Sequence, residues 1–152
     1  MLQAYSPENG RNERFSIGGR QVLLNLAKNP AGFNQNIRDV SGDRTDKDII
    51  IVINDNAQDG TDVSWLWDVD FDRLQEETVR SVTVSGIRCQ DMRLRLKYVS
   101  ISADLIPDVK TAIEKRLSDG CGNLYVLVNY SALYGAHEIL GRLEAEGEAR
   151  TG

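Results

Sequence analysis

The sequence predicts an α/β domain in which a mostly parallel sheet is covered by helices on both faces. Apolar runs typical of buried strands occur at 49–53, 81–84 and 124–128, and segments with helical spacing or capping signals lie between them. This alternation of strand and helix predicts a three-layer, Rossmann-like arrangement. With 152 residues, the chain is long enough to bury a core without disulfides or structural metals.

The first part of the domain is expected to be an N-terminal hairpin followed by a helix. Strands at 14–17 and 21–26 flank two glycines at 18–19, and glycine readily adopts the positive φ angles of a two-residue turn. A helix over 30–40 follows, with Asn29 as its N-cap and a proline in its first turn.

The rest of the chain is expected to supply shorter elements around the core strands. These are a segment at 70–77, an amphipathic helix at 89–98, a short strand at 99–102, a helix at 107–117 ended by Gly120, and a last helix at 132–146. The domain therefore spans 13–146, with loose ends at 1–12 and 147–152.

Composition and charge argue against several classes of function. The net charge is −5, whereas a nucleic-acid surface needs clustered lysine and arginine. The N-terminus lacks the features of a signal peptide, and no apolar run approaches the roughly 20 residues that span a bilayer, so a cytoplasmic protein is expected. The sequence contains neither a GxxxxGK[ST] phosphate loop nor a GxGxxG fingerprint, so this chain alone is not expected to hold a nucleotide cofactor.

Cysteine and histidine usage argues against metal and thiol chemistry. Cys89 and Cys121 are far apart and form no CxxC pair, so they are expected to be reduced and at least partly buried. His137 is the single histidine and lies in a helical segment, where a packed or solvated side chain is favoured over a general base. No metal site is expected.

The segment 54–68, with the sequence N-D-N-A-Q-D-G-T-D-V-S-W-L-W-D, is the most informative in the chain. It follows a buried strand, and open α/β sheets build their sites at the carboxyl ends of strands. A calcium loop of the EF-hand type is disfavoured, because Ala57 and Leu66 stand where ligands are required. The segment can orient a catalytic partner or dock another protein, and the residues alone leave both alternatives open.

Two N-terminal segments carry a resemblance to a known family. Segments 10–15 (G-R-N-E-R-F) and 24–34 (L-N-L-A-K-N-P-A-G-F-N) are similar to the start of Mur-ligase C-terminal domains, where the second reads roughly D-Y-A-H-N-P. This sequence has Asn25 in place of the acid and Lys28 in place of the histidine. Together with the segment 54–68 and V-S-G-I-R at 84–88, these departures resemble one branch, the Mur-ligase-like subunit (MurT) of lipid II isoglutaminyl synthase.

The resemblance implies a Mur-ligase C-terminal domain reached through a hinge at 1–12 from an ATP-binding central domain, with ATP and Mg held upstream. That subunit would activate the α-carboxyl of D-glutamate in the lipid II stem peptide, at the inner face of the cell membrane. A class I glutaminase subunit with a Cys-His pair would form a heterodimer with it and supply ammonia, giving D-isoglutamine. The isolated chain is expected to be inactive.

The family further implies that the glutaminase borrows a carboxylate from this domain, and the motif places that role on Asp62. A carboxylate bonded to imidazole Nδ1–H fixes the tautomer and stabilises imidazolium while the thiolate attacks. The alternative is that Asp62 caps a turn or is solvated. Asp55 and Asp59 are expected to shape the loop and contribute to the partner interface. For Trp65 and Trp67, core packing of both competes with one anchoring residue and one that meets the partner.

Two other groups of residues have weaker functional interpretations. Lys28, Asn29 and Asn34 open a helix N-terminus, which favours anions, so substrate contact there is an expectation beside a capped turn with a solvated lysine. A basic run at 88–97 is expected to be a solvated helix face rather than a substrate contact. A non-catalytic docking module for the glutaminase is the alternative function, and an independent small-molecule binder ranks last.

Overall fold

The computed structural model describes residues 13–56, 62–120 and 122–151, and it contains one six-stranded mixed sheet. The strand order is β1-β2-β6-β3-β4-β5, and all neighbouring pairs are parallel except β1 with β2. The strands are β1 (Glu13–Ile17), β2 (Arg20–Leu26), β3 (Lys47–Val52), β4 (Val79–Ser85), β5 (Asp104–Leu105) and β6 (Asn123–Val128). The expected mostly parallel sheet is confirmed.

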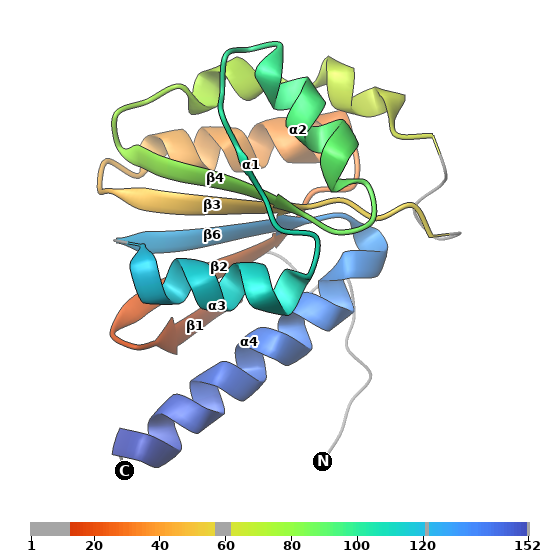
Figure 1. The fold of residues 1–152 in the computed structure, drawn as a ribbon. Helices are drawn as coiled ribbons and strands as arrows, with labels where there is room; N and C mark the ends of the chain where they lie inside the picture. The colour runs from red at the N-terminus through yellow and green to blue at the C-terminus, as the bar shows by residue number, and fades with distance from the viewer. Residues whose placement is uncertain (1–12, 57–61, 121, 152) are drawn as a thin grey trace.

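Helices cover both faces of this sheet, as the sequence predicted (Figure 1). They are α1 (Pro30–Gly42), α2 (Cys89–Lys97), α3 (Val109–Asp119) and α4 (Tyr130–Thr151), with two short 3₁₀ helices, η2 (Ser64–Asp68) and η3 (Phe71–Leu74). One core cluster joins the sheet to α1, η2, η3 and α2, and the other joins it to α3 and α4. The domain therefore has three layers.

Strand β3 shows why its sequence is a continuous apolar run. Ile49 and Ile51 point into the core beneath α1 and α2, whereas Ile50 and Val52 point into the core beneath α3 and α4. A strand that is buried on both faces has no solvent-facing positions, so it does not alternate between apolar and polar residues. β3 is thereby fixed at the centre of the sheet, between β6 and β4.

Two local predictions near the N-terminus are confirmed. Gly18 and Gly19 have φ angles of 59° and 78°, as the tight turn between β1 and β2 requires. Asn29 caps α1, because its side-chain oxygen accepts a hydrogen bond of 2.8 Å from Gly32 N. Cys89 is buried, and Cys121 lies outside the described residues.

Two predictions of secondary structure are wrong. Residues 99–102 do not form a strand; they turn the chain after α2, with Ser100 at a φ of 61°, and the edge strand is Asp104–Leu105. The apolar residues of this turn pack on the core, which produced the strand-like pattern. The loose tail expected at 147–152 is also wrong for 147–151, because α4 runs to Thr151. The linker predicted at 1–12 lies outside the described residues.

In the described part of the chain, no helix is both long and apolar enough to cross a membrane.

Candidate functional site

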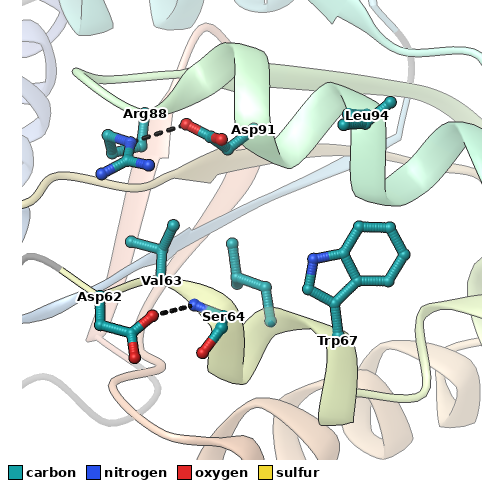
Figure 2. Close-up of a pocket in the computed structure, with 8 residues that line it drawn as sticks. Asp62, Val63, Ser64, Trp67, Arg88, Asp91 and Leu94 are labelled. Carbon is teal, nitrogen blue, oxygen red and sulfur yellow. Dashed lines mark hydrogen bonds and ion pairs between the residues drawn. The ribbon is translucent and has the colours of Figure 1, made fainter.

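The candidate site lies where the chain leaves β3 and where it enters α2. Val52 of β3 pairs with Ser85 of β4, so the carboxyl ends of these parallel strands lie side by side. η2 faces the first turns of α2, and a cavity of about 290 Å³ separates them (Figure 2). Its lining residues are Asp62, Val63, Ser64, Leu66, Trp67, Arg88, Asp91 and Leu94.

Asp62 lies at the η2 side of this cavity with an exposed side chain. Its Oδ1 accepts a hydrogen bond of 2.9 Å from Ser64 N (Figure 2). Hydrogen bonds from the backbone and side chain of Ser64, together with the nearby charge of Arg88, lower the pKa of Asp62. Asp62 therefore does make the turn-type bond of the alternative interpretation. A carboxylate has about four lone-pair sites, however, so it can accept a further donor.

Arg88 joins the two walls of the site. Its Nη1 lies 3.2 Å from Asp55 Oδ2, and its Nε donates to Asp91 Oδ2 at 2.6 Å (Figure 2 shows the second contact). The carboxylates of Asp91 and Asp55 raise the pKa of Arg88. Asp55 is thus tied to the start of α2 by an ion pair, and its place in a partner interface stays a prediction. Asp59 lies outside the described residues.

The start of the loop is fixed by an asparagine pair that sequence reasoning missed. Asn54 N donates to Asn129 Oδ1 at 3.1 Å, and Asn129 Nδ2 donates to Asn54 O at 2.7 Å. The Asn54 side chain also accepts from Ile87 N at 2.9 Å. Asparagine directly after a buried strand is a turn signal that pointed to this arrangement.

Gly86 explains the motif V-S-G-I-R in physical terms. Its φ is +91°, and a Cβ at this position would lie 2.7 Å from Ile53 O. Only glycine fits both requirements. The close approach lets Arg88 N donate to Ile53 O at 2.9 Å, which places the Arg88 side chain against the loop that follows β3.

The two tryptophans have different environments. Trp65 is partly buried and packs on the core, with its ring centroid 6.1 Å from that of Phe33. Trp67 is 47% exposed and meets Tyr98 edge to face at 4.8 Å. The arrangement with one anchor and one exposed residue is the one observed. Leu94 and Tyr98, which are also exposed, extend this apolar surface on α2.

The basic run on α2 is not a uniform solvated face, so that prediction is wrong in part. Arg93 and Lys97 are exposed, whereas Arg95 is buried. The seven-residue spacing from Arg88 to Arg95 brings both side chains to the same side of the helix. That side faces the segment after β3. The charge pattern of the helix does not reveal this contact, so it did not distinguish Arg95 from the exposed Arg93 and Lys97.

The residues expected at the N-terminus of α1 do not line the cavity beside Asp62. Lys28 is exposed, Asn29 is used as the N-cap, and the Asn34 side chain accepts from Asp70 N at 2.8 Å. The structure therefore favours a capped turn with a solvated lysine, and substrate contact stays a prediction.

A second cavity of about 470 Å³ lies at the same edge of the sheet, between the starts of α3 and α4. Asn54, Gly86, Asp108, Lys110 and Ser131 are among its lining residues. Asp108 is used there as the N-cap of α3, accepting from Thr111 N at 3.0 Å. His137, farther along α4, lies 2.7 Å from Glu13 of β1, so it acts as a helix residue in contact with the sheet.

The fold is that of a Mur-ligase C-terminal domain. A folylpolyglutamate synthase from Thermotoga maritima superposes with a TM-score of 0.61 at 21% identity, over 87% of this chain and 30% of that one. UDP-N-acetylmuramate-alanine ligase MurC from the same organism superposes with a TM-score of 0.54 at 15% identity, over 87% of this chain and 30% of that one.

The chain belongs to the MurT ligase C-terminal family, whose sequence profile matches residues 26–133. It is 33% identical to the MurT subunit of lipid II isoglutaminyl synthase (glutamine-hydrolyzing) from Staphylococcus aureus strain COL, over 97% of this chain and 34% of that protein. The corresponding subunit from Streptococcus pneumoniae is 28% identical over 86% of this chain and 30% of its own length. This chain therefore spans about a third of the relatives that it matches.

Proposed function

We propose that this chain is the C-terminal domain of the ligase subunit of a glutamine-dependent, ATP-consuming amidotransferase. The reaction converts D-glutamate of the lipid II stem peptide to D-isoglutamine in peptidoglycan biosynthesis. Family membership and the names of the relatives support this assignment. The relatives are about three times longer than the region they share with this chain, which leaves room for an ATP-binding domain elsewhere in the subunit. The working complex acts in the cytoplasm, at the inner face of the membrane.

Asp62 supplies the third member of the catalytic group in the glutaminase partner. The observation that carries this assignment is an exposed carboxylate with a lowered pKa at the edge of a cavity. An ionised aspartate accepts a hydrogen bond from imidazole Nδ1–H, which leaves Nε2 free to take the proton of the cysteine thiol. The same charge stabilises the imidazolium while the thiolate attacks the glutamine amide.

The surface around Asp62 suits a protein partner. Exposed apolar side chains lie next to the cavity, from Trp67, Leu94 and Tyr98. Aromatic side chains such as those of tryptophan and tyrosine are enriched at the buried centre of protein interfaces. Asp55 and Arg88 give the same region a charged rim. The glutaminase subunit is the proposed occupant, forming a heterodimer with the complete ligase subunit.

ATP and Mg belong to the rest of the subunit in this account. The sequence has no phosphate loop, and the N-terminus of α1 is already capped by Asn29. These residues do not fit a nucleotide grip, so the isolated chain is expected to be inactive. Lys28 and Asn34 stay candidates for contact with substrate in the closed subunit.

A docking module without a catalytic residue is the second candidate function, favoured by the apolar surface on its own. Asp62→Asn in the complete complex distinguishes the two. If Asp62 is catalytic, the variant loses glutamine-dependent amidation of lipid II but keeps amidation driven by added ammonia. A docking module predicts that both activities survive.

A further inference from the structure

Arg95 is buried, with 7% exposure, on the side of α2 that covers η2. Its Nε donates to Leu66 O at 2.9 Å and its Nη2 donates to Val69 O at 2.6 Å. The guanidinium carbon lies 5.1 Å from the ring centroid of Trp67 and 5.2 Å from that of Phe71. Among the described residues, no carboxylate forms an ion pair with Arg95. Its charge is instead matched by two carbonyl dipoles and two aromatic faces.

The backbone does not need Arg95 to satisfy these two carbonyl groups. Leu66 O also accepts from Val69 N at 3.3 Å, and Val69 O accepts from Phe71 N at 3.0 Å. A buried charge is costly, and an apolar side chain of similar volume is often equally stable in its place. What the guanidinium adds is a two-point attachment of η2 to α2, which an apolar side chain cannot provide.

A short series of hydrogen bonds leads from this attachment to Asp62. Leu66 N donates to Val63 O at 3.1 Å, and Asp62 accepts from Ser64 N at 2.9 Å. The stretch from Asp62 to Leu66 is therefore one hydrogen-bonded turn, and Arg95 holds its last carbonyl. A shift of η2 along α2 moves the carboxylate with it.

We infer that Arg95 is a positioning residue, which fixes the turn that carries Asp62 and so places the carboxylate for the imidazole of the partner. This inference rests on the proposed role of Asp62. A misplacement of about 1 Å can cost on the order of 100-fold in rate, so the attachment matters to catalysis more than to folding.

The test uses the complete ligase subunit assembled with its glutaminase. Arg95→Met keeps the volume and removes the donors, and Arg93→Met makes the same change on the exposed side of the same helix. We expect kcat for glutamine hydrolysis to fall about 10- to 100-fold in Arg95→Met, with KM for glutamine and subunit affinity unchanged. Arg93→Met keeps the parental kcat.

A double variant separates positioning from general damage. If Arg95 acts through Asp62, then Asp62→Asn with Arg95→Met is no slower than Asp62→Asn alone. A parental kcat in Arg95→Met overturns the inference, and so do losses that multiply in the double variant. If Arg95→Met fails to assemble, Arg95→Lys gives the answer. A single ammonium cannot span both carbonyls, so the same loss of kcat is expected, and a parental rate contradicts it.

Failure of the inference is distinguishable from failure of the proposed function. If Asp62→Asn has a reduced kcat for glutamine hydrolysis while Arg95→Met keeps the parental kcat, only the positioning role of Arg95 is ruled out. If Asp62→Asn keeps the parental kcat, the catalytic role of Asp62 is ruled out, and the positioning role of Arg95 is ruled out with it.

Discussion

The Arg88 guanidinium lies 3.2 Å from the Asp55 carboxylate and joins the segment that follows β3 to the first turn of α2. The same guanidinium contacts Asp91 at 2.6 Å, and its charge adds to the Ser64 hydrogen bonds that lower the pKa of Asp62. Two carboxylates, Asp55 and Asp91, contact this guanidinium and a third, Asp62, is influenced by its charge, so these three carboxylates outnumber the single guanidinium. A surface of this kind favours the charged form of an imidazole that approaches it.

Gly86→Ala should destabilise the domain. The backbone at this position has a φ of +91°, and the added methyl group would lie 2.7 Å from Ile53 O. Strain of this kind costs on the order of 1–3 kcal/mol, measured as a lower free energy of unfolding in urea.

Gly42→Ala is the matched control for that experiment. Gly42 is the last residue of α1, and a Cβ there meets no atom within 4 Å. It should keep or slightly raise the free energy of unfolding. Equal effects of the two substitutions would show that the turn after β4 is not constrained as described.

Stability should fall in acid because of Asp43. Burial opposes ionisation, but hydrogen bonds from Thr45, Asn123 and Tyr125 outweigh it and hold the pKa of Asp43 well below its usual value. The unfolded chain then binds more protons than the folded one at acid pH, so this contribution is complete above about pH 4 and is lost as the pH falls further. Urea unfolding between pH 2 and 6 measures the effect.

Tyr125→Phe and Asp43→Asn test the cause of this pH dependence. Tyr125 donates to Asp43 at 2.8 Å, so its removal should reduce the loss of stability in acid, and Asp43→Asn should reduce it more. If the free energy of unfolding of Asp43→Asn falls in acid as much as that of the parent, other carboxylates are responsible for the effect.

The two tryptophans should separate stability from binding. Trp65→Ala should lower the free energy of unfolding by about 2 kcal/mol or more, because Trp65 packs on the core. Trp67→Ala should cost less, about 1 kcal/mol, since Trp67 is half-exposed and loses one edge-to-face contact with Tyr98 and the cation–π contact with Arg95. In the full ligase subunit, Trp67→Ala should weaken glutaminase binding at least about tenfold, as expected for an interface hot spot. Calorimetric titration measures that affinity, and an unchanged value would place the interface elsewhere.

The strands and helices of the core could be predicted because their signals are local. The apolar run at 49–53, the glycine pair at 18–19 and the cap at Asn29 each specify their own geometry. The strand expected at 99–102 was wrong because apolar residues in a turn that packs on the core resemble a short strand. The loose tail was wrong for 147–151 because Gly147, which follows the expected helix end, lies inside α4 and does not end it.

The candidate site was only partly predictable, because its geometry depends on contacts between distant segments. The motif resemblance singled out Asp62, and the tryptophan pair predicted one core-packed and one outward-facing side chain, of which the structure shows the packing of Trp65 and the exposure of Trp67. No local pattern showed that Arg88 pairs with Asp55, or that Arg95 is buried while Arg93 is exposed. Those facts follow from β4 lying beside β3, which brings α2 against the segment that follows β3.

In the proposed function, Asp62 takes part in glutamine hydrolysis on another subunit. The most direct measurement is kcat for that hydrolysis by Asp62→Asn in the assembled complex, together with the affinity between subunits. Loss of the orienting carboxylate costs about 10⁴ in rate in the catalytic triad of serine proteases, so we expect a fall of at least about 100-fold with affinity preserved. A parental kcat in a fully assembled Asp62→Asn complex would show that Asp62 is not catalytic and would leave the domain as a docking module.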